Sequence, residues 1–468
     1  MHETPETRPK IAIIGAGFTG IALIAALARK EMAAHIYLIE KTEKFAAGDA
    51  YRTPFPYHLL NARANDMSAL ADESDHFTAW LKRQKLPADM IDPDIPIARQ
   101  FVPRILYHQY LADLLDEIMA KSPSLTVEKI QDEVVDIEPG QESVKVILVG
   151  KKSITANQVV LATGNNPPSA LPFPVSEDIH CIHNPWDYTA LSDIPADEPV
   201  LIVGTGLSMV DAVLTLHHQR HQAKIYSLSR RGLLPLPHTE SIMAYALDYQ
   251  ALPKTMPALM RAVRAECKKA AQAGGDWRAV IHQMRLCLTD IWQALDHRAR
   301  QQFLRHVLPY WNIHRHRVHE KLYAMLNEKQ ANGQLTVIAG RMQSAVDGKA
   351  LVKLRGTGKE ESFPVKHIIN CMGSGMDLAV ESQPLLKAMC KRGMIALDDL
   401  HLGLQVSSDY QLKTDSGETI ANCFAIGPPM RGELWECIAV PEIREHCNLL
   451  ADELVKANQA ELKTAVEK

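Results

Sequence analysis

Apolar and polar positions follow a strand–helix–strand order twice along the chain. Residues 10–14 form a short apolar run, residues 21–30 carry an apolar helical face, and residues 35–40 form a second apolar run. The same order returns further on, at residues 199–203, 210–219 and 224–229. Short apolar runs separated by one amphipathic helix are typical of neighbouring strands in a parallel sheet. The pattern therefore predicts two βαβ units.

A glycine-rich turn joins the first strand to the first helix, and it reads Gly15-Ala16-Gly17-Phe18-Thr19-Gly20. Gly15 permits the tight turn, Gly17 lets the backbone approach a pyrophosphate, and Gly20 lets the helix pack close to the strand. The helix N-terminus offers free N–H groups to the phosphates. Glu40, which ends the second strand, can accept hydrogen bonds from ribose hydroxyls. These parts together favour a dinucleotide site over a chance glycine turn, and the expected contacts include Phe18, Thr19 and Lys41.

The second turn differs from the first in two places, and it reads Gly204-Thr205-Gly206-Leu207-Ser208-Met209. Met209 takes the third glycine position, so helix and strand are expected to lie less close there. Ser229, Arg230 and Arg231 stand where the first unit has Glu40. A carboxylate would repel a 2′-phosphate, whereas guanidinium groups bind it through paired hydrogen bonds. This favours NADP(H) over NAD(H); the alternative is that both arginines only solvate a strand end.

We therefore expect FAD at the first turn and NADP at the second. The contacts expected for NADP are Gly204, Gly206, Ser208, Met209, Ser229, Arg230 and Arg231.

Two further segments, residues 125–167 and 335–375, resemble each other. Each reads as a strand, an antiparallel hairpin arm and a buried strand that ends in a turn of small residues. Such turns let the chain pass close to a nucleotide, and the residues concerned are Ala162, Thr163 and Gly164 in the first copy and Gly373 in the second. The repeat predicts an α/β fold with two related Rossmann-like dinucleotide-binding domains, for FAD and for NADP, and a helical insertion.

The expected domains follow from this order. An FAD-binding domain would take residues 1–172 and 376–468, and an NADP-binding domain residues 173–235 and 331–375, with a helical insertion at 236–330. The run from His314 to Arg317 near the end of the insertion alternates histidine and arginine. It can bind an anion, a metal or the substrate, or it can be a solvated basic helix face. Zinc is disfavoured, because no acid or cysteine stands at ligand spacing nearby.

Composition narrows the functional classes. The chain has 468 residues and a net charge of −4, so it has no general attraction to nucleic acid or anionic membranes. No apolar stretch approaches the roughly 18 residues of a spanning helix. The eight cysteines form no CxxC pair, which argues against a disulfide framework and a dithiol redox centre. We expect a reduced, cytoplasmic protein with a small-molecule substrate; an oligomer is compatible with the sequence.

With these motifs in place, the chain resembles the flavoproteins with two dinucleotide-binding domains, among them flavin monooxygenases and pyridine-nucleotide-dependent reductases. More narrowly, it resembles the FAD-NAD(P)-binding (YdhS-like) family. The closer resemblance lies in GDAYRTPFPYHLLNARANDMSAL (48–70), FVPRILYHQYL (101–111), SRRGLLPLPH (229–238), RHVLPYWNIHRHR (305–317) and FAIGPPMRGELWECIAVPEIR (424–444).

The resemblance implies roles by position. The segment after the first acid would fold over FAD, with contacts from Gly48, Tyr51, Asn61 and Met67. Arg104 would contact the flavin or a phosphate, or else form a surface ion pair.

The late FAIG motif is implied to lie near the ribityl and phosphate groups through Gly427. Many relatives have an acid after this glycine, whereas this chain has Pro428. A helix beginning near Val440 and Pro441 would point its N-terminus at the isoalloxazine, where N–H groups stabilise negative charge on a reduced flavin. Arg431 and Glu433 would line the ring or the substrate pocket.

The expected chemistry begins with hydride transfer from NADPH to the flavin. A monooxygenase would then pass one oxygen atom to a soft nucleophile such as an amine nitrogen, whereas a reductase would pass electrons to another acceptor. The missing cysteine pair disfavours disulfide reductases. Amine N-oxygenation leads, because the superfamily's N-hydroxylases share this layout. A flavin-binding regulatory protein without turnover is the third hypothesis, and no residue can be assigned as catalytic acid or base.

Overall fold

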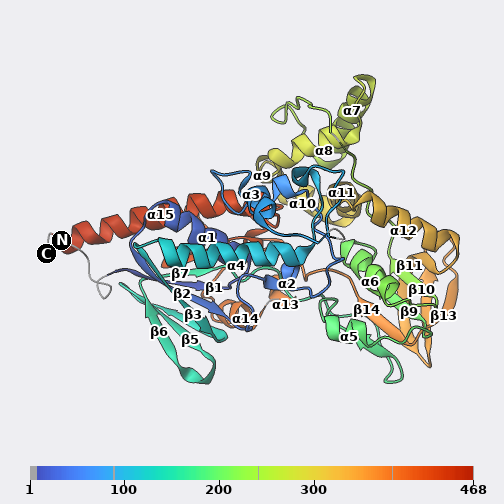
Figure 1. Ribbon diagram of the computed structural model, residues 1–468, viewed down its shortest axis with the longest axis horizontal. Helices are drawn as coiled ribbons and strands as arrows, with labels where there is room; N and C mark the ends of the chain where they lie inside the picture. Colours follow the sequence, from blue (N-terminus) through green and yellow to red (C-terminus); the bar gives the residue numbers. More distant parts are fainter. Residues whose placement is uncertain (1–7, 88–89, 241, 382, 467–468) are drawn as a thin grey trace. The chain divides into compact units, whose positions relative to one another are not determined.

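The computed structural model describes residues 8–87, 90–240, 242–381 and 383–466. The chain divides into two compact units (Figure 1). Unit 1 comprises Met1–Asn166 and Met376–Lys468, and unit 2 comprises Pro167–Gly375. Each unit is an α/β fold on a mainly parallel sheet, so the predicted fold class is confirmed.

Unit 1 is built on a six-stranded sheet in which all strands except β15 run parallel. In spatial order the strands are β15 (Gln411–Lys413), β16 (Thr419–Ala425), β7 (Gln158–Leu161), β1 (Lys10–Ile14), β2 (Ala34–Glu40) and β3 (Leu125–Gln131). Because parallel strands end at the same edge, the ends of β7 and β16 lie beside the glycine turn that follows β1.

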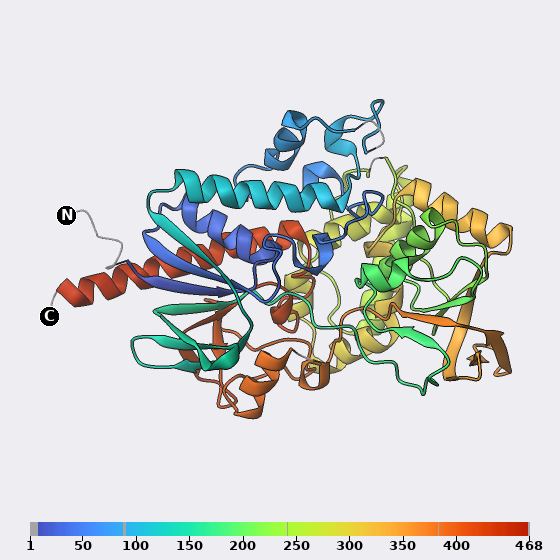
Figure 2. The same ribbon diagram turned by 60° about the horizontal axis from the view of Figure 1, so that its bottom comes forward.

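Helices cover one face of this sheet and a small antiparallel sheet lies on the other (Figure 2). Helix α1 contacts both α4 and α15. The longer helices are α1 (Phe18–Arg29), α3 (His76–Arg83), α4 (Arg104–Lys121), α14 (Pro384–Lys391) and α15 (Val440–Val466), and the short ones are α2 (Gly48–Tyr51) and α13 (Leu378–Glu381). The small sheet consists of β4 (Val134–Pro139), β5 (Val144–Leu148) and β6 (Ser153–Ala156).

Unit 2 is built on a seven-stranded sheet with a parallel centre. Its order is β13 (Glu360–Pro364), β12 (Lys349–Leu354), β11 (Leu335–Val346), β10 (Ile225–Ser229), β9 (Val200–Val203), β14 (His367–Asn370) and β8 (His180–Ile182). Its helices are α5 (Tyr188–Ser192), α6 (Leu207–His218), α7 (Met256–Gln272), α8 (Trp277–Leu286), α9 (Leu288–Gln293), α10 (His297–Gln302), a π-helical turn (Phe303–Val307), α11 (Leu308–Arg315) and α12 (Glu320–Ala331).

The predicted internal repeat is present in the pairing of the strands. Strand β7 returns beside β1, and β14 returns beside β9 in the same parallel sense. The copies differ at the hairpin. In unit 2 the single strand β11 pairs with β10 and then bends to pair with β12. In unit 1 the corresponding segment is divided into two strands, β3 and β4, and the hairpin that begins with β4 forms a separate sheet.

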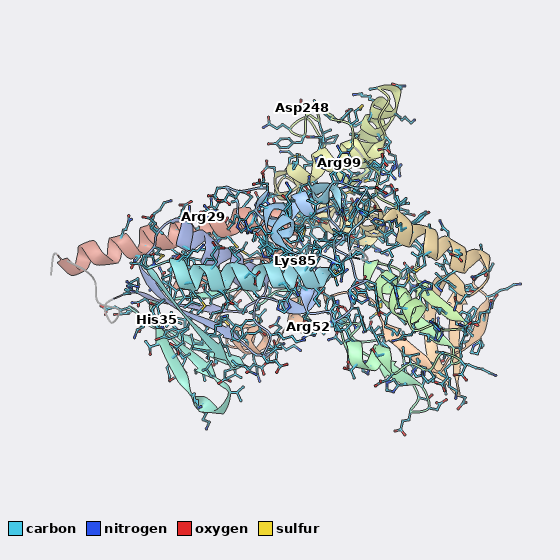
Figure 3. The ribbon with its side chains drawn as sticks, viewed as in Figure 1. Arg29, His35, Arg52, Lys85, Arg99 and Asp248 are labelled. Carbon is cyan, nitrogen blue, oxygen red and sulfur yellow. The ribbon has the colours of Figure 1, made fainter. Side chains whose placement is uncertain are left out.

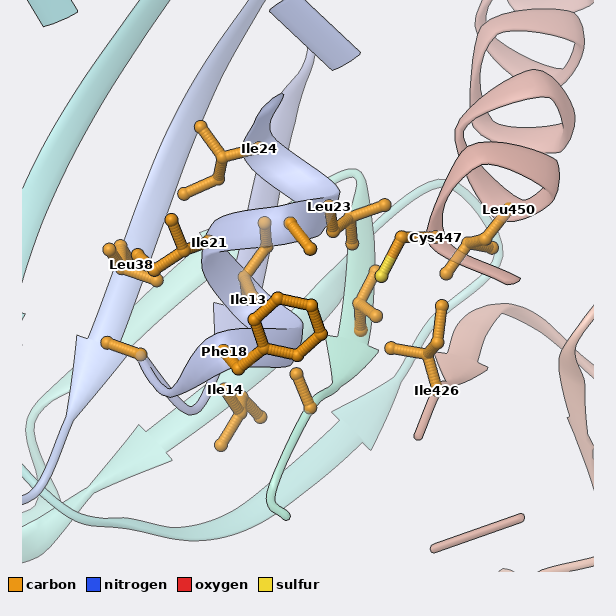
Figure 4. Close-up of a cluster of buried hydrophobic side chains, with 14 of the residues drawn as sticks. Ile13, Ile14, Phe18, Ile21, Leu23, Ile24, Leu38, Ile426, Cys447 and Leu450 are labelled. Carbon is orange, nitrogen blue, oxygen red and sulfur yellow. The ribbon is translucent and has the colours of Figure 1, made fainter. Parts of the chain in front are cut away.

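The core of unit 1 joins α1, α15 and the sheet. Leu23 on α1, Cys447 and Leu450 on α15, and Ile426 just after β16 lie in one cluster (Figure 4), and all four are fully buried. Residues 18–25 of α1 are all buried, as expected for a helix enclosed on several sides. This packing fixes the first turn of α1 against the end of β16.

Among the described residues of unit 1, the ion pairs involve mostly side chains at its surface. Arg29 at the end of α1 pairs with Asp72 at 3.4 Å, and His35 on β2 lies 3.1 Å from Glu128 (Figure 3). Exposed pairs of this kind contribute about 1 kcal/mol or less, so the apolar core carries most of the stability.

Two further observations concern the chain as described. All eight cysteines are free thiols. Across the described residues, no helix combines the length and the apolar character needed to cross a membrane.

Two neighbouring leucines on α15 test the packing of this core. Leu450→Ala should lower the free energy of unfolding by about 2–5 kcal/mol, because it leaves a cavity against α1. Leu449 is 51% exposed, so Leu449→Ala should change it by about 0.5 kcal/mol or less. Urea unfolding followed by far-UV circular dichroism measures both variants. Equal losses would mean that α15 does not pack as described.

Candidate functional site

The first glycine turn leaves no room for side chains at two positions. Gly15 has φ +108°, and a methyl group added to it would lie 2.3 Å from the Ala162 carbonyl oxygen. A methyl group on Gly20 would lie 2.2 Å from the Gly15 carbonyl oxygen. At Gly17 the nearest atom, Cα of Gly48, would be 3.5 Å away, which is an ordinary contact. Gly15 and Gly20 therefore serve the fold, whereas Gly17 leaves the surface of the turn open.

The N-terminus of α1 begins at this turn. Gly17 is its N-cap, and no side chain caps the helix within the described residues. An uncapped helix start offers N–H groups to an anion. The Glu40 carboxylate lies beside it, where Oε2 accepts from the Ala16 N–H at 3.1 Å and Oε1 from the Thr42 N–H at 3.1 Å. These bonds hold the carboxylate beside the turn and leave further lone pairs on both oxygens.

The segment after β2 folds back onto the turn. The Ala46 N–H donates to the Ala16 carbonyl at 2.8 Å, and Gly48 lies close to Gly17. The Tyr51 ring lies 4.6 Å from that of Tyr107, and burial raises the pKa of the Tyr51 phenol. Of the other two predicted residues, Met67 is buried and Asn61 is exposed.

Arg104 holds two of the segments that carry the family resemblance together. Its Nε donates to the Leu59 carbonyl at 3.0 Å, and its N–H donates to the His58 carbonyl at 2.8 Å. Leu60 and Val102 extend this pairing, with the Leu60 N–H donating to the Val102 carbonyl at 2.9 Å. Arg104 therefore positions the HLLN loop beside the start of α4.

The end of β16 completes the site. Gly427 has φ +81°, and a methyl group on it would lie 3.0 Å from the Thr19 hydroxyl oxygen. The Cys437 thiol donates to the Gly427 carbonyl at 3.1 Å, and the Cys447 thiol to the Thr19 carbonyl at 3.5 Å. Helix α15 begins at Val440, followed by Pro441, as expected. The late motif thus meets the first turn of α1.

The turn after β7 carries a buried polar atom. The Thr163 hydroxyl is buried, and no described residue forms a hydrogen bond with it. Ala162 before it faces Gly15, and Gly164 after it has φ +72°. Gln383 holds the turn by donating to the Thr163 carbonyl at 2.9 Å. The hydroxyl, the uncapped start of α1 and the Glu40 carboxylate make a set of donors and acceptors that fits a dinucleotide.

Tyr107 was not predicted from the sequence. Its ring is fully buried between Phe18, at 6.2 Å, and Phe77, at 5.0 Å. Among the described residues nothing pairs with its buried hydroxyl, and burial raises the pKa of that phenol well above its ordinary value. The only sequence signal is its place on the apolar face of residues 104–121.

The second glycine turn repeats the steric constraint of the first. Gly204 has φ +123°, and a methyl group on it would lie 2.0 Å from the Cys371 carbonyl oxygen. Gly206 has no atom within 4 Å of such a methyl group and starts α6 without a side-chain cap. Met209 is fully buried, so it packs into the core of unit 2. Gly373, in the turn after β14, has φ +87°.

Ser229 occupies the place that Glu40 has in unit 1. Its Oγ lies 3.0 Å from the Thr205 hydroxyl oxygen and accepts from the Gly232 N–H at 2.9 Å. The end of β10 therefore carries a neutral side chain where β2 carries a carboxylate.

A basic cleft of about 650 Å³ opens next to this serine. Arg231 stacks over the Tyr310 ring at 4.9 Å and donates to its hydroxyl at 3.1 Å, while Arg355 donates to the Arg230 carbonyl at 3.3 Å. None of the described residues that line it is acidic, and they are Arg230, Arg231, Arg305, His306, Pro309, Gly340, Arg341, Gln343, Lys353, Leu354 and Arg355. The sequence predicted the first two arginines, whereas strand pairing brings in Arg341 on β11 and Arg355 just after β12.

His314, the first residue of the His314–Arg317 run, makes contacts within the helical part of unit 2. His314 Nδ1 lies 2.7 Å from the Tyr310 carbonyl oxygen, and its ring meets that of Trp277 edge-on at 4.6 Å. No group of three or more His, Cys, Asp or Glu side chains in the described part of the chain could hold a metal ion.

Comparison with solved structures defines the class of fold, that of flavoenzymes with two dinucleotide-binding domains. The ornithine N-hydroxylase of Kutzneria sp. 744 has a TM-score of 0.66 at 14% identity, covering 97% of this chain and 100% of that one. The L-lysine 6-monooxygenase of Pseudomonas syringae has a TM-score of 0.60 at 17% identity, covering 97% and 99%. The thioredoxin reductase of Lactococcus lactis has a TM-score of 0.53 at 12% identity, covering 97% and 100%.

A comparison of the sequence with family models gives one further likeness. Residues 12–166 match the model of the FAD-NAD(P)-binding family, so this part of the chain is similar to that family. A search among curated proteins found no match.

Two glycine variants in the first turn separate folding from ligand binding. Gly20→Ala should lower the free energy of unfolding by about 1–3 kcal/mol, because its methyl group collides with the turn. Gly17→Ala should leave the stability of the FAD-free protein within about 1 kcal/mol of the wild type and weaken FAD binding about tenfold or more. Thermal unfolding and FAD titration measure the two effects. Unchanged FAD affinity in Gly17→Ala would exclude close approach of a phosphate to the turn.

Proposed function

We propose that the protein is an FAD-dependent oxidoreductase that takes reducing equivalents from NADPH and hydroxylates the nitrogen of a small amine or amino acid. The assignment of NADPH is supported mainly by one contrast. Unit 1 has the Glu40 carboxylate beside its turn, whereas the described residues that line the cleft beside Ser229 in unit 2 include no acid. The family match over residues 12–166 supports nucleotide binding independently.

FAD fits the turn of unit 1. The pyrophosphate would lie over Gly17 at the start of α1, where the backbone is open and N–H groups are free to donate. The Glu40 carboxylate would accept hydrogen bonds from the adenosine ribose, and the Thr163 hydroxyl would gain the partner that it lacks among the described residues.

NADPH fits the turn of unit 2. Its pyrophosphate would lie over Gly206 at the start of α6, and its 2′-phosphate in the cleft beside Arg230 and Arg231. A guanidinium group binds phosphate through charge-assisted, paired hydrogen bonds. Arg231 is already oriented by Tyr310, so little side-chain freedom is lost on binding.

Bound flavin would accept a hydride and pass electrons on, and the chain would supply positioning and charge. Arg431 is one source of positive charge; burial lowers the pKa of its guanidinium group, and Glu436 opposes that shift. The start of α15 near Val440 is a second source. Both would stabilise negative charge on a reduced flavin.

N-hydroxylation is favoured over disulfide reduction for two reasons. The fold similarity is higher to an ornithine N-hydroxylase than to a thioredoxin reductase, with TM-scores of 0.66 and 0.53. All eight cysteines are free, and burial raises the pKa values of the Cys371, Cys437 and Cys447 thiols above the ordinary value. Thiols held protonated are poor nucleophiles. An NADPH-dependent flavin reductase with another acceptor is the second candidate.

Arginine variants test the choice of nucleotide. Arg230→Ala with Arg231→Ala should raise the KM for NADPH about tenfold to a hundredfold and leave that for NADH nearly unchanged, because charge-assisted hydrogen bonds contribute about 1.5–3 kcal/mol each. Arg264→Ala, at an exposed site on α7, is the matched control. Flavin reduction under anaerobic conditions gives both constants. An equal loss for NADH would show that the pair does not read the 2′-phosphate.

Product analysis tests the reaction. The FAD-loaded protein should oxidise NADPH faster when ornithine, lysine or cadaverine is added, and the matching amine should yield a hydroxylamine in proportion to the NADPH consumed. The nitrogen of that amine is the soft nucleophile that the hypothesis requires. If NADPH is consumed but all oxygen appears as hydrogen peroxide with every amine, the reductase candidate is the better one. If NADPH reduces no flavin in the absence of oxygen, neither enzyme hypothesis holds.

A further inference from the structure

Four arginines in the helical part of unit 2 gather outside the lining of the basic cleft. Arg278 and Arg285 lie on α8, Arg315 is the last residue of α11, and Arg317 follows two positions later. Helices α8 and α11 contact each other (Figure 1). This arginine cluster contains half of the His314–Arg317 run and takes no part in the proposed dinucleotide sites.

The backbone holds Arg317 and Arg278 against the same short segment, residues 236–238. The Val318 N–H donates to the Leu236 carbonyl at 3.0 Å, and the Val318 carbonyl accepts from the His238 N–H at 2.9 Å. Between these bonds, the Pro237 carbonyl accepts from Arg278 Nη2 at 3.2 Å. A main-chain carbonyl therefore holds the Arg278 guanidinium group directly, and main-chain hydrogen bonds hold the backbone next to Arg317.

Asp276 supplies the opposing negative charge, but Arg278 engages it. Its Oδ2 accepts from Arg278 Nη1 at 2.5 Å, and its Oδ1 accepts from the Arg278 N–H at 2.8 Å. The Nε and Nη1 atoms of Arg317 are buried, and neither has an acceptor among the described residues. Burial, followed by the charges of Arg278 and Arg315, lowers the pKa of Arg317 to about 10.

A half-buried cation whose buried donor atoms are unpaired, beside like charges, is unfavourable unless an anion joins it. Aromatic contacts also hold Arg278, because its guanidinium carbon lies 4.5 Å from the centre of the Trp277 ring, which meets the His314 ring edge-on. A guanidinium group that is already held by its neighbours loses little freedom when it binds an anion.

We propose that Arg317, together with Arg278, Arg285 and Arg315, forms a binding site for an oxyanion, the carboxylate or phosphate group of a small ligand. A planar guanidinium group offers paired donors that match both groups. The site lies entirely within unit 2, and its existence does not depend on which dinucleotides the protein binds.

Calorimetric titration of the full chain tests this site. The probes are succinate and inorganic phosphate, with sodium chloride at the same ionic strength as the reference. The wild type should bind at least one probe saturably below about 10 mM, and Arg317→Gln should weaken that binding about tenfold or more. Arg264→Gln should bind as the wild type does. Binding of succinate alone would indicate a carboxylate ligand, and binding of phosphate alone a phosphorylated one.

Thermal unfolding separates a binding role from a structural one. Without a probe, Arg317→Gln should unfold at the wild-type temperature or above it, because a like-charge repulsion has been removed. Arg317→Lys, which keeps the charge, serves if the glutamine variant does not fold, and it should bind the probe more weakly because an ammonium group lacks the paired donors. The proposal is overturned if probe affinity is the same in the wild type and these variants. A response no larger than that to chloride would also overturn it, since it would indicate an adventitious ion only.

Discussion

Both glycine turns depend on one close contact between neighbouring strands. A carbonyl oxygen at the end of one strand lies against the first glycine of the turn that follows the next strand. In unit 1 the Ala162 carbonyl faces Gly15, and in unit 2 the Cys371 carbonyl faces Gly204. No side chain fits at either glycine, and both adopt a positive φ that other residues rarely reach. This contact sets how closely the two strand ends approach at each turn, and the helices that follow, α1 and α6, both begin without a side-chain cap among the described residues.

The two turns have surroundings of opposite charge: a carboxylate lies beside the turn of unit 1, and a cleft lined by basic side chains lies beside the turn of unit 2. Glu40 and Ser229 each stand 25 positions after the first glycine of their turn. The carboxylate is held by the Ala16 and Thr42 N–H groups, whereas the serine is followed by Arg230 and Arg231, which line the basic cleft. Under the proposed function, the internal repeat would carry two related nucleotides, one with a free ribose and one with a ribose phosphate.

The sequence predicted what depends on local pattern and missed what depends on topology. Apolar runs and glycine spacing were enough to predict β1, α1 and β2, because together these lie within about 30 residues of chain, and the return of similar segments later in the chain predicted the repeat. Arg341 and Arg355 were not predicted as site residues, because only the pairing of β10, β11 and β12 brings them beside Arg230. Tyr107 was missed for a similar reason: a tyrosine on an apolar helix face reads as ordinary core, and its buried hydroxyl is visible only in the fold.

A crystal structure of the full chain grown with FAD and NADP⁺ is the most direct test of the account. The account predicts FAD in unit 1, with its pyrophosphate over Gly17 and a ribose hydroxyl on the Glu40 carboxylate. It also predicts NADP⁺ in unit 2, with its 2′-phosphate in the cleft beside Arg230 and Arg231. A 2′-phosphate that points to solvent away from the cleft, or a turn in unit 2 that binds no dinucleotide, would contradict it.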